Sequence, residues 1–142
     1  MNIVFKAESP NFVVSTLSDT IKKGGSSLLK AEDIAHLAVE AASGKKARDV
    51  VMLNVAELCS FTSYFVLCSA ESDRQLEAIW QDILDTIKSE GILPQHREGT
   101  PQSGWMLADF GSVIVHVMTL AEWDYYQLDK LWAGAPAVVR IQ

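Results

Sequence analysis

Apolar positions recur along this 142-residue chain with two different spacings, and each spacing predicts one kind of element. Residues 31–42 carry apolar side chains three and four positions apart, and Gly44 follows as a stop, so this segment is predicted to be a helix. A second helix is predicted from Ser72 to Gly91, where the side chain of Ser72 caps the amide of Gln75 and Gln75 reaches back. Its apolar stripe consists of Leu76, Ile79, Trp80, Ile83, Leu84 and Ile87.

Short runs that are rich in β-branched and aromatic side chains predict strands. These runs are residues 50–55, 61–69, 104–110 and 112–119, with a weaker one near 93–97. Apolar side chains fall on both faces of the 112–119 run, which predicts a central strand that is covered on both sides. A short helix is predicted at 121–132. This order of elements predicts an α/β fold, a single domain with a mixed β-sheet of about five strands flanked by helices.

The first 27 residues show no sustained periodicity. Turn or linker signals occur at Ser9-Pro10-Asn11 and at Gly24-Gly25-Ser26-Ser27. We therefore expect residues 1–27 to be a flexible N-terminal extension, with one short helix near 14–21, and residues 28–142 to form the folded domain.

The net charge of −6 is unevenly distributed along the chain. Residues 1–30 hold four lysines and two acidic side chains, a charge of +2, so the remainder carries −8. An acidic domain is a poor general binder of phosphate backbones, and opposite potentials favour encounter with a basic protein. The charge therefore predicts a basic protein partner and argues against sequence-specific binding of nucleic acid.

The composition, 49% hydrophobic and 21% charged, is that of an ordinary globular domain that buries a core without disulfides or metals. The apolar runs are far shorter than a membrane span, and the N-terminus does not have the pattern of a signal peptide. We therefore expect a cytoplasmic protein with no membrane contact. Cys59 and Cys68 are expected to be free thiols.

Several separated motifs follow one another in a single order. They are Thr62-Ser63-Tyr64-Phe65-Val66, Ser69, Ser72-Asp73-Arg74-Gln75, Glu98-Gly99, the stretch from Trp105 to His116, Tyr126-x-Leu128 and Leu131-Trp132. On these motifs the chain resembles the Iojap family, the ribosomal silencing factors (RsfS), over residues 28–136. Ser63 stands where the family usually has Asp, so no carboxylate role is carried over to it. Phe110 stands where Tyr or Leu is usual, which conserves bulk.

The resemblance implies a mixed sheet of nucleotidyltransferase-like topology. It also implies binding to the large ribosomal subunit through ribosomal protein L-fourteen, at the face that meets the small subunit. Occupying that face would block subunit joining sterically and repress translation when nutrients are scarce. This function requires no catalysis, cofactor or metal. A homodimer that uses the same apolar surface stays open as an alternative.

Aromatic side chains dominate interface energetics where they are exposed, and core packing is the other interpretation for each of them. The candidates are Trp105, Phe110, Trp123, Tyr125, Tyr126 and Trp132. The resemblance favours Trp105 and Phe110 and, less specifically, Tyr126. The predicted partner-binding site has Trp105, Met106 and Phe110 as anchors, Asp109, Ser72, Asp73 and Arg74 at the rim, and Tyr126 as a further contact.

The alternative function is that of a nucleotidyltransferase-like enzyme that binds nucleotides. Such chemistry needs paired carboxylates to hold magnesium, usually beside a Gly-Ser turn. Asp109 has no acidic neighbour on its face, and Gly111-Ser112 comes after it. Glu122 and Asp124 are two positions apart in a predicted helix, where their side chains point apart. We therefore expect no enzyme activity of this kind.

Three polar features are open to two interpretations. His116 is expected to be a hydrogen-bonded histidine of the core or rim, and the hairpin could bring Asp109 close enough to orient its ring. Ser72 to Gln75 fit a helix cap, although helix N-termini also bind anions. The basic residues of 45–48 form either a solvated connector or a contact to RNA or an acidic partner.

Overall fold

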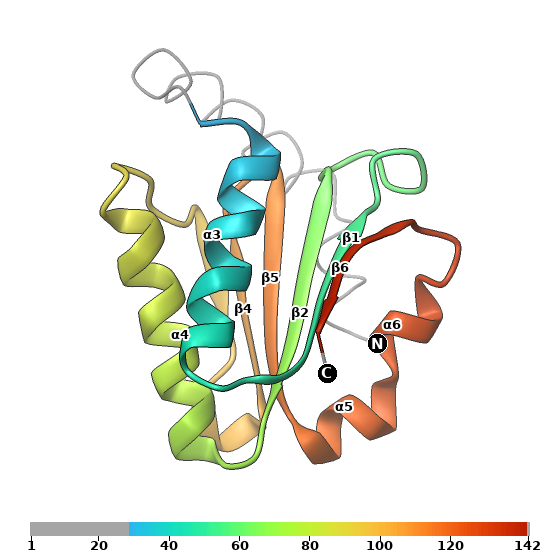
Figure 1. Cartoon of the computed structure of the whole chain (residues 1–142). Helices are drawn as coiled ribbons and strands as arrows, with labels where there is room; N and C mark the ends of the chain where they lie inside the picture. Colours follow the sequence, from blue (N-terminus) through green and yellow to red (C-terminus); the bar gives the residue numbers. More distant parts are fainter. Residues whose placement is uncertain (1–28, 142) are drawn as a thin grey trace.

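A six-stranded mixed sheet forms the centre of the structure, a computed structural model that describes residues 29–141 (Figure 1). The predicted short helix near 14–21 lies outside the described residues. The elements follow in the order α3 (Ala31–Gly44), β1 (Arg48–Asn54), β2 (Tyr64–Ala70), α4 (Asp73–Lys88), β3 (His96–Glu98), the 3₁₀ turn η1 (Pro101–Ser103), β4 (Trp105–Asp109), β5 (Val113–Thr119), α5 (Leu120–Tyr126), α6 (Leu128–Leu131) and β6 (Ala137–Ile141).

The strands are arranged in the order β3-β4-β5-β2-β1-β6. The central pair, β2 and β5, is parallel, and the other neighbouring pairs are antiparallel. The carboxyl ends of the parallel pair therefore lie at the same end of the sheet, where β2 leads into α4 and β5 leads into α5 (Figure 1). The predicted mixed sheet is confirmed, with one strand more than expected, because β6 was not predicted.

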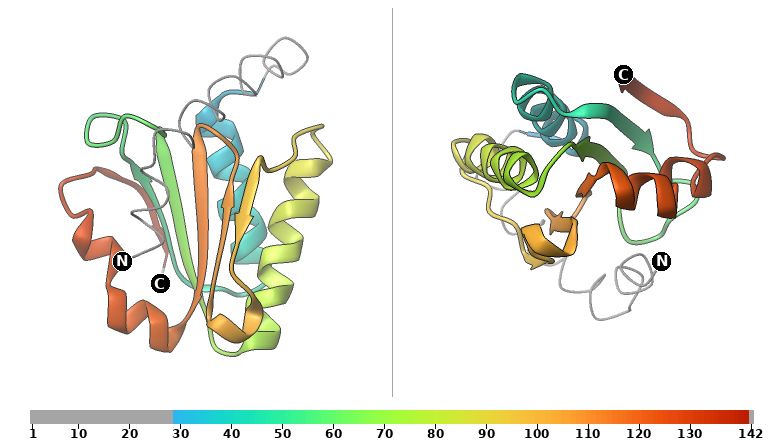
Figure 2. Two further views of the ribbon diagram at one scale, coloured as in Figure 1. Left: turned by 180° about the vertical axis from the view of Figure 1, so that it is seen from behind. Right: turned by 90° about the horizontal axis from the view of Figure 1, so that it is seen from below.

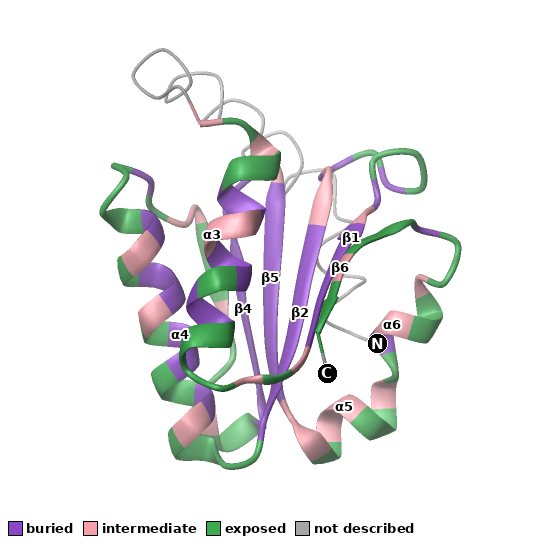
Figure 3. Ribbon diagram, in the orientation of Figure 1, coloured by how far each residue is buried: buried purple, intermediate pink, exposed green. Residues whose placement is uncertain are grey.

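Helices cover both faces of this sheet. The long helices α3 and α4 lie on one face, and the short helices α5 and α6 lie on the other (Figure 2). Val113, Val115 and Val117 of β5 join the core beneath α3 and α4, whereas Ile114 and Met118 join the core beneath α5 and α6. The prediction of a central strand covered on both sides is confirmed, and the central strands are buried over most of their length (Figure 3).

The helix α4 shows why the sequence pattern identified it so clearly. Its six predicted apolar side chains are all buried, and the Oγ atom of Ser72 accepts a hydrogen bond from the amide of Gln75 at 3.1 Å. After Lys88 the chain reaches Gly91 with a φ of 84°, a left-handed conformation that glycine adopts without steric cost. Within residues 29–141, no helix combines the length and apolar character needed to cross a membrane.

Candidate functional site

Trp105 lies on the sheet face that α5 and α6 cover, and its side chain is packed there. It is only 5% exposed. Its indole Nε1–H donates a hydrogen bond to Nδ1 of His116 at 3.2 Å. Its ring contacts that of Tyr126 in α5, with 4.8 Å between the ring centroids. Trp105 therefore joins the sheet to α5 instead of offering its own ring to a partner.

The three predicted anchors do not form one exposed surface. Met106 is 8% exposed and Phe110 is 3% exposed, and both belong to the core beneath α3 and α4. Successive side chains of a strand point to opposite faces of the sheet, so Trp105 and Met106 cannot share a surface. The interpretation of Trp105, Met106 and Phe110 as exposed anchors is therefore wrong. Helices cover both faces of the sheet, and all three side chains are buried in the core.

Asp109 is also buried, not at a rim. Its Oδ1 accepts a hydrogen bond from the amide of Gly111 at 2.8 Å, which is the local turn that aspartate commonly forms. Nδ1 of His116 accepts a hydrogen bond from Trp105, and Nε2 of His116 has no hydrogen-bond partner among the described residues. The hypothesis that Asp109 orients the ring of His116 is therefore wrong, and Asp109 instead shapes the turn between the two strands.

His116 is a buried, hydrogen-bonded core histidine, as one of the two interpretations expected. Burial lowers the pKa of His116 from 6.5 to about 3, so the ring is neutral near pH 7. Because Nδ1 accepts from Trp105, the proton of the neutral ring sits on Nε2. Nε2 of His116 and Nε1 of Trp132 are both buried without a hydrogen-bond partner among the described residues. The rings of His116 and Trp132 pack edge-on against the ring of Phe65, with centroid separations of 5.3 Å and 4.9 Å.

Residues 123–132, in α5, α6 and the position that follows α6, carry five apolar or aromatic side chains that are exposed or half-buried. We call this set the α5–α6 surface, and it consists of Trp123, Tyr125, Tyr126, Leu131 and Trp132. Tyr125 is 79% exposed and Leu131 is 50% exposed, while the other three are half-buried. Tyr126 packs between Trp105 below it and the ring of Tyr125, whose centroid is 4.8 Å away. Among the predicted anchors and the further contact Tyr126, only Tyr126 belongs to the α5–α6 surface.

Three acidic side chains and two basic ones, Lys130 and Arg140, surround the α5–α6 surface. Asp124 is exposed, and Glu122 and Asp129 are half-buried. Asp129 lies 3.8 Å from Arg140 of β6, so its charge is partly compensated. Leu131 was not among the candidate residues in the sequence, because an exposed leucine in a short helix has the same pattern as a buried one.

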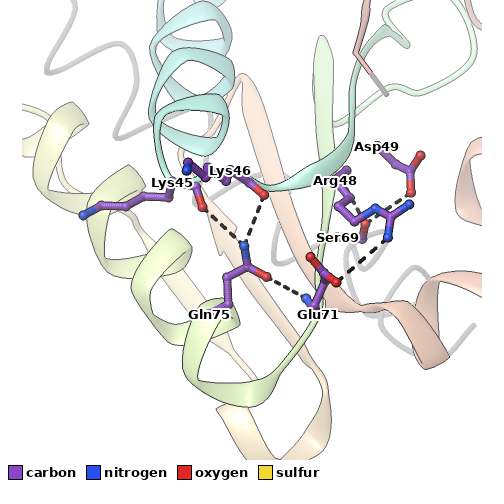
Figure 4. Close-up of polar contacts among 7 residues, drawn as sticks. All are labelled: Lys45, Lys46, Arg48, Asp49, Ser69, Glu71 and Gln75. Carbon is purple, nitrogen blue, oxygen red and sulfur yellow. Dashed lines mark hydrogen bonds and ion pairs between the residues drawn. The ribbon is translucent and has the colours of Figure 1, made fainter.

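The predicted rim residues Ser72, Asp73 and Arg74 are exposed where β2 passes into α4. The capping interpretation is confirmed for Ser72. Gln75 reaches back one residue further than expected, since its Oε1 accepts from the amide of Glu71 at 2.7 Å. Its Nε2 donates to the carbonyl oxygens of Lys45 and Lys46, which ties the connector between α3 and β1 to the start of α4 (Figure 4).

The basic connector is exposed but is not a uniformly positive surface. The guanidinium of Arg48 lies 4.0 Å from the carboxylate of Glu71 (Figure 4). The hydroxyl of the buried Ser69 donates to the carbonyl oxygen of Arg48 at 3.0 Å and contacts the carboxylate of Asp49 at 3.3 Å. These contacts give the connector a structural role in fixing the start of β1.

The metal-ligand and thiol chemistry that the sequence raised is tested by the arrangement of the described residues. Across residues 29–141, no three His, Cys, Asp or Glu side chains gather as metal ligands. Cys59 and Cys68 are buried, and neither forms a disulfide among the described residues. Burial raises the pKa of Cys68 to about 12, which leaves it protonated and unreactive as a nucleophile.

Comparisons with known proteins agree on one family. The family model described as ribosomal silencing factor during starvation matches residues 29–142. A protein of Halalkalibacterium halodurans named ribosomal silencing factor RsfS is 37% identical over 107 residues, which cover 75% of this chain and 92% of that protein. The mouse protein named mitochondrial assembly of ribosomal large subunit protein 1 is 31% identical over 62% of this chain and 40% of its own length. A crystal structure of a Chromobacterium violaceum protein superposes with a TM-score of 0.71 at 31% identity, and covers 74% of this chain and 88% of that one.

Proposed function

This chain belongs to the ribosomal silencing factor family, and we propose that it silences ribosomes by binding the large ribosomal subunit and blocking its joining to the small subunit. The names of its relatives support this proposal, since one is a ribosomal silencing factor and another is named for assembly of the large ribosomal subunit. We propose ribosomal protein L-fourteen as the direct partner, as the family resemblance implies. The expected location is the cytoplasm, where ribosomes are found.

The observation that carries the proposal is the exposure of aromatic and apolar side chains on α5 and α6. Tyr125 and Leu131 are exposed to an extent that core packing does not require. Exposed aromatic side chains that pack on buried aromatic side chains beneath them are typical centres of protein interfaces. The acidic side chains around them complement a basic ribosomal protein and would speed its association. The function then depends on association alone, with no chemical step.

We propose a supporting role for the buried members of the predicted site. Trp105 holds Tyr126 in place through ring contact, and its hydrogen bond to His116 fixes the indole. Met106, Asp109 and Phe110 stabilise β4 and the turn that follows it. A substitution of Trp105 should therefore weaken partner binding by loosening the α5–α6 surface, even though the ring itself is covered.

Ser72, Asp73 and Arg74 remain candidates for the edge of the interface. They lie at the end of the sheet where α5 also begins, because the carboxyl ends of β2 and β5 meet there (Figure 1). The exposed side chains of Asp73 and Arg74 line a shallow groove beside Gln102 of η1. A partner that covers α5 could extend over this end of the molecule.

The test is co-sedimentation of the purified protein with separated large and small ribosomal subunits. We expect the protein to pellet with the large subunit and not with the small one. Preincubation with the large subunit should then lower the fraction of joined particles when the small subunit is added. Binding to neither subunit, or binding that leaves joining unchanged, would contradict the proposal. A pull-down with purified ribosomal protein L-fourteen tests the direct partner.

A homodimer is the competing use of the α5–α6 surface. The same exposed rings could pair with those of a second copy. Light scattering of the free protein at several concentrations measures this directly. If Tyr125→Ala abolishes both a dimer and large-subunit binding, the two partners compete for one surface.

A further inference from the structure

The strand β6 forms one edge of the sheet, and its outer side is open. It pairs with β1 alone, since it stands last in the strand order, and no strand among residues 29–141 lies beyond it. Its residues are exposed along most of the strand (Figure 3). The backbone groups on the outer side of an edge strand can bond to a further extended segment, so an open edge of this kind is a site for strand addition.

The hydrogen-bond pattern identifies which backbone groups of β6 point outward. The amide of Asn54 donates to the carbonyl oxygen of Pro136 at 2.9 Å, so Asn54 faces β6. Bonded residues alternate along an antiparallel pair, and the next residue of β1 that faces β6 is therefore Met52, whose partner is Val139. The N–H and C=O groups of Arg140, one position further along, point away from β1 and are the groups that an added strand would meet.

Exposed edges of sheets are commonly protected by charged side chains, by proline or by a short strand. The opposite edge strand, β3, has such protection, because it is three residues long and all three are polar. In contrast, β6 has five residues, of which four are apolar. Val138 and Ile141 are each 42% exposed, and the one charged side chain, Arg140, lies 3.8 Å from the carboxylate of Asp129. The edge at β6 therefore lacks the protection that β3 has.

The chain itself contains a segment that fits this edge. Residues 2–6, with the sequence Asn-Ile-Val-Phe-Lys, have the length of β6 and are rich in the β-branched and aromatic side chains that favour strands. The turn signal at Ser9-Pro10-Asn11 follows this run and separates it from the rest of the N-terminal residues. Residues 1–30 carry a charge of +2 and the remainder carries −8, so the two parts of the chain attract each other.

We propose that residues 2–6 add to the outer edge of β6 as a further strand of the sheet. The connection is long enough, because residues 7–28 span up to about 70 Å when they are extended. The chain then enters α3, which packs over β1 and β2, the two strands next to β6 in the sheet (Figure 1). A segment attached in this way has an effective concentration in the millimolar range, which favours it over a second copy of the protein at micromolar concentration.

This pairing would give the N-terminal residues a role within the protein. The added strand would bond to the backbone of Arg140 and cover part of the side chains of Val138 and Ile141. It would thereby close an edge at which copies of the protein could otherwise associate. The match to the family model begins at residue 29, so the proposal concerns a part of the chain outside that match, and it does not depend on the proposed ribosomal function.

The test is amide hydrogen exchange of the full chain, followed by NMR at two protein concentrations. The double variant Ile3→Pro/Val4→Pro removes two neighbouring amides, one of which must face β6 because successive backbone groups of a strand alternate in direction. We expect the amide of Arg140 to exchange at least about tenfold more slowly in the unmodified protein than in this variant. The rates in the unmodified protein should be the same at both concentrations.

A matched control introduces the same substitutions elsewhere in the N-terminal residues. The variant Phe12→Pro/Val13→Pro places two prolines in the other apolar run of this segment and should leave the exchange of Arg140 unchanged. The amide of Leu67, in the central strand β2, reports whether the domain stays folded in each variant.

Three results would overturn the proposal. The first is equal exchange of the Arg140 amide in the unmodified protein and in Ile3→Pro/Val4→Pro. The second is faster exchange of Arg140 in the control variant as well, which would assign the pairing to a different part of the N-terminal residues. The third is slower exchange at the higher protein concentration, which would assign the edge to a second copy of the protein.

Discussion

Trp105 and His116 are joined across neighbouring strands by a buried hydrogen bond, with 3.2 Å between Nε1 of the indole and Nδ1 of the imidazole. The register pairs Trp105 with Met118 and His116 with Leu107, so the two rings are diagonal neighbours on one face of the sheet. This bond requires a histidine that accepts at Nδ1, which the imidazolium ion does not do. Burial and the hydrogen bond therefore favour the same neutral form of His116.

The first prediction concerns the pH dependence of stability. The pKa of His116 is about 3 in the folded protein, below the unperturbed value of 6.5, so between these values the unfolded state binds the additional proton. The stability that neutral His116 contributes is complete above pH 6.5 and is lost as the pH falls towards 3. In urea unfolding, the free energy of unfolding should fall by about 1 kcal/mol per pH unit near pH 5 from this group alone.

Two variants separate this effect from other titrations. His116→Asn keeps a hydrogen-bond acceptor near Nδ1 but does not titrate, so its free energy of unfolding should have a shallower slope between pH 6 and about pH 4.5. His36→Asn is the matched control, because it replaces a histidine of α3 that is 45% exposed and lies on the other face of the sheet from the Trp105–His116 contact. Equal slopes for the unmodified protein and His116→Asn would contradict the assignment.

The second prediction concerns Trp105→Ala. Truncation of a buried tryptophan removes its packing and leaves His116 without its donor, so the free energy of unfolding should fall by about 3–5 kcal/mol. Because Tyr126 loses the ring beneath it, large-subunit binding should also weaken by more than 1 kcal/mol, on the order of tenfold. Chemical denaturation comes first, and binding is then measured under conditions in which the variant is folded. A folded variant with unchanged affinity would exclude a supporting role for Trp105.

The sequence predicted α3, α4 and the central strands well because their apolar patterns are long. The single helix predicted at 121–132 is instead divided into α5 and α6 at Gln127, whose φ of 49° is left-handed. It did not predict β6, whose five residues are mostly exposed and therefore lack a clear alternation of apolar and polar positions. The placement of Trp105 and Met106 shows the limit for the binding site. Both residues looked like anchors, but whether a large apolar side chain is covered depends on helices far along the chain.

Local polar contacts were predicted where the partners are close in sequence. The cap of Ser72 on Gln75 is such a case, since both partners lie within one helical turn. The hypothesis for Asp109 and His116 failed because Trp105, and not Asp109, contacts the imidazole ring. Both residues are diagonal neighbours of His116 on one face of the sheet, and no feature of the two strand sequences indicated which of them would bond to it.

The third prediction tests the α5–α6 surface through Tyr125→Ala. Tyr125 is 79% exposed, so its removal should change the free energy of unfolding by no more than about 0.5 kcal/mol. If the surface is the interface, the affinity for the large subunit should fall about tenfold. Leu93→Ala is the matched control, because Leu93 is 49% exposed but lies between α4 and β3. Equal affinities for the two variants would remove α5 from the proposed interface.

The fourth prediction concerns the predicted rim residue Arg74. Its side chain is exposed, so Arg74→Ala should leave the free energy of unfolding within about 0.5 kcal/mol of the original value. A charge at the edge of an interface acts mainly on the association rate and its dependence on salt. Because Arg74 has the same charge sign as the proposed basic partner, its removal should speed association at low salt, and the difference should shrink as salt is added. Arg97→Ala, which removes an exposed arginine of β3, serves as the control and should behave like the unmodified protein.

The last prediction concerns Gly99, which lies beside the backbone of Trp105. Gly99 has a φ of 92°, and a Cβ atom at this position would overlap the carbonyl oxygen of Trp105. The overlapping atom belongs to the backbone of β4, so it cannot rotate away as a flexible side chain could. Gly99→Ala should therefore combine the strain of a left-handed alanine with displacement of the start of β4. We expect the free energy of unfolding to fall by at least about 2 kcal/mol.

Gly91→Ala separates the two contributions to this effect. Gly91 has a similar φ of 84°, but a Cβ atom there would have no atom within 4 Å. Its substitution should cost only the conformational strain, about 1–2 kcal/mol. The difference between the two variants then measures the close approach of Gly99 to Trp105. If both lose the same stability in urea unfolding, β4 accommodates the added methyl group, and Gly99 has no special part in positioning Trp105 beneath Tyr126.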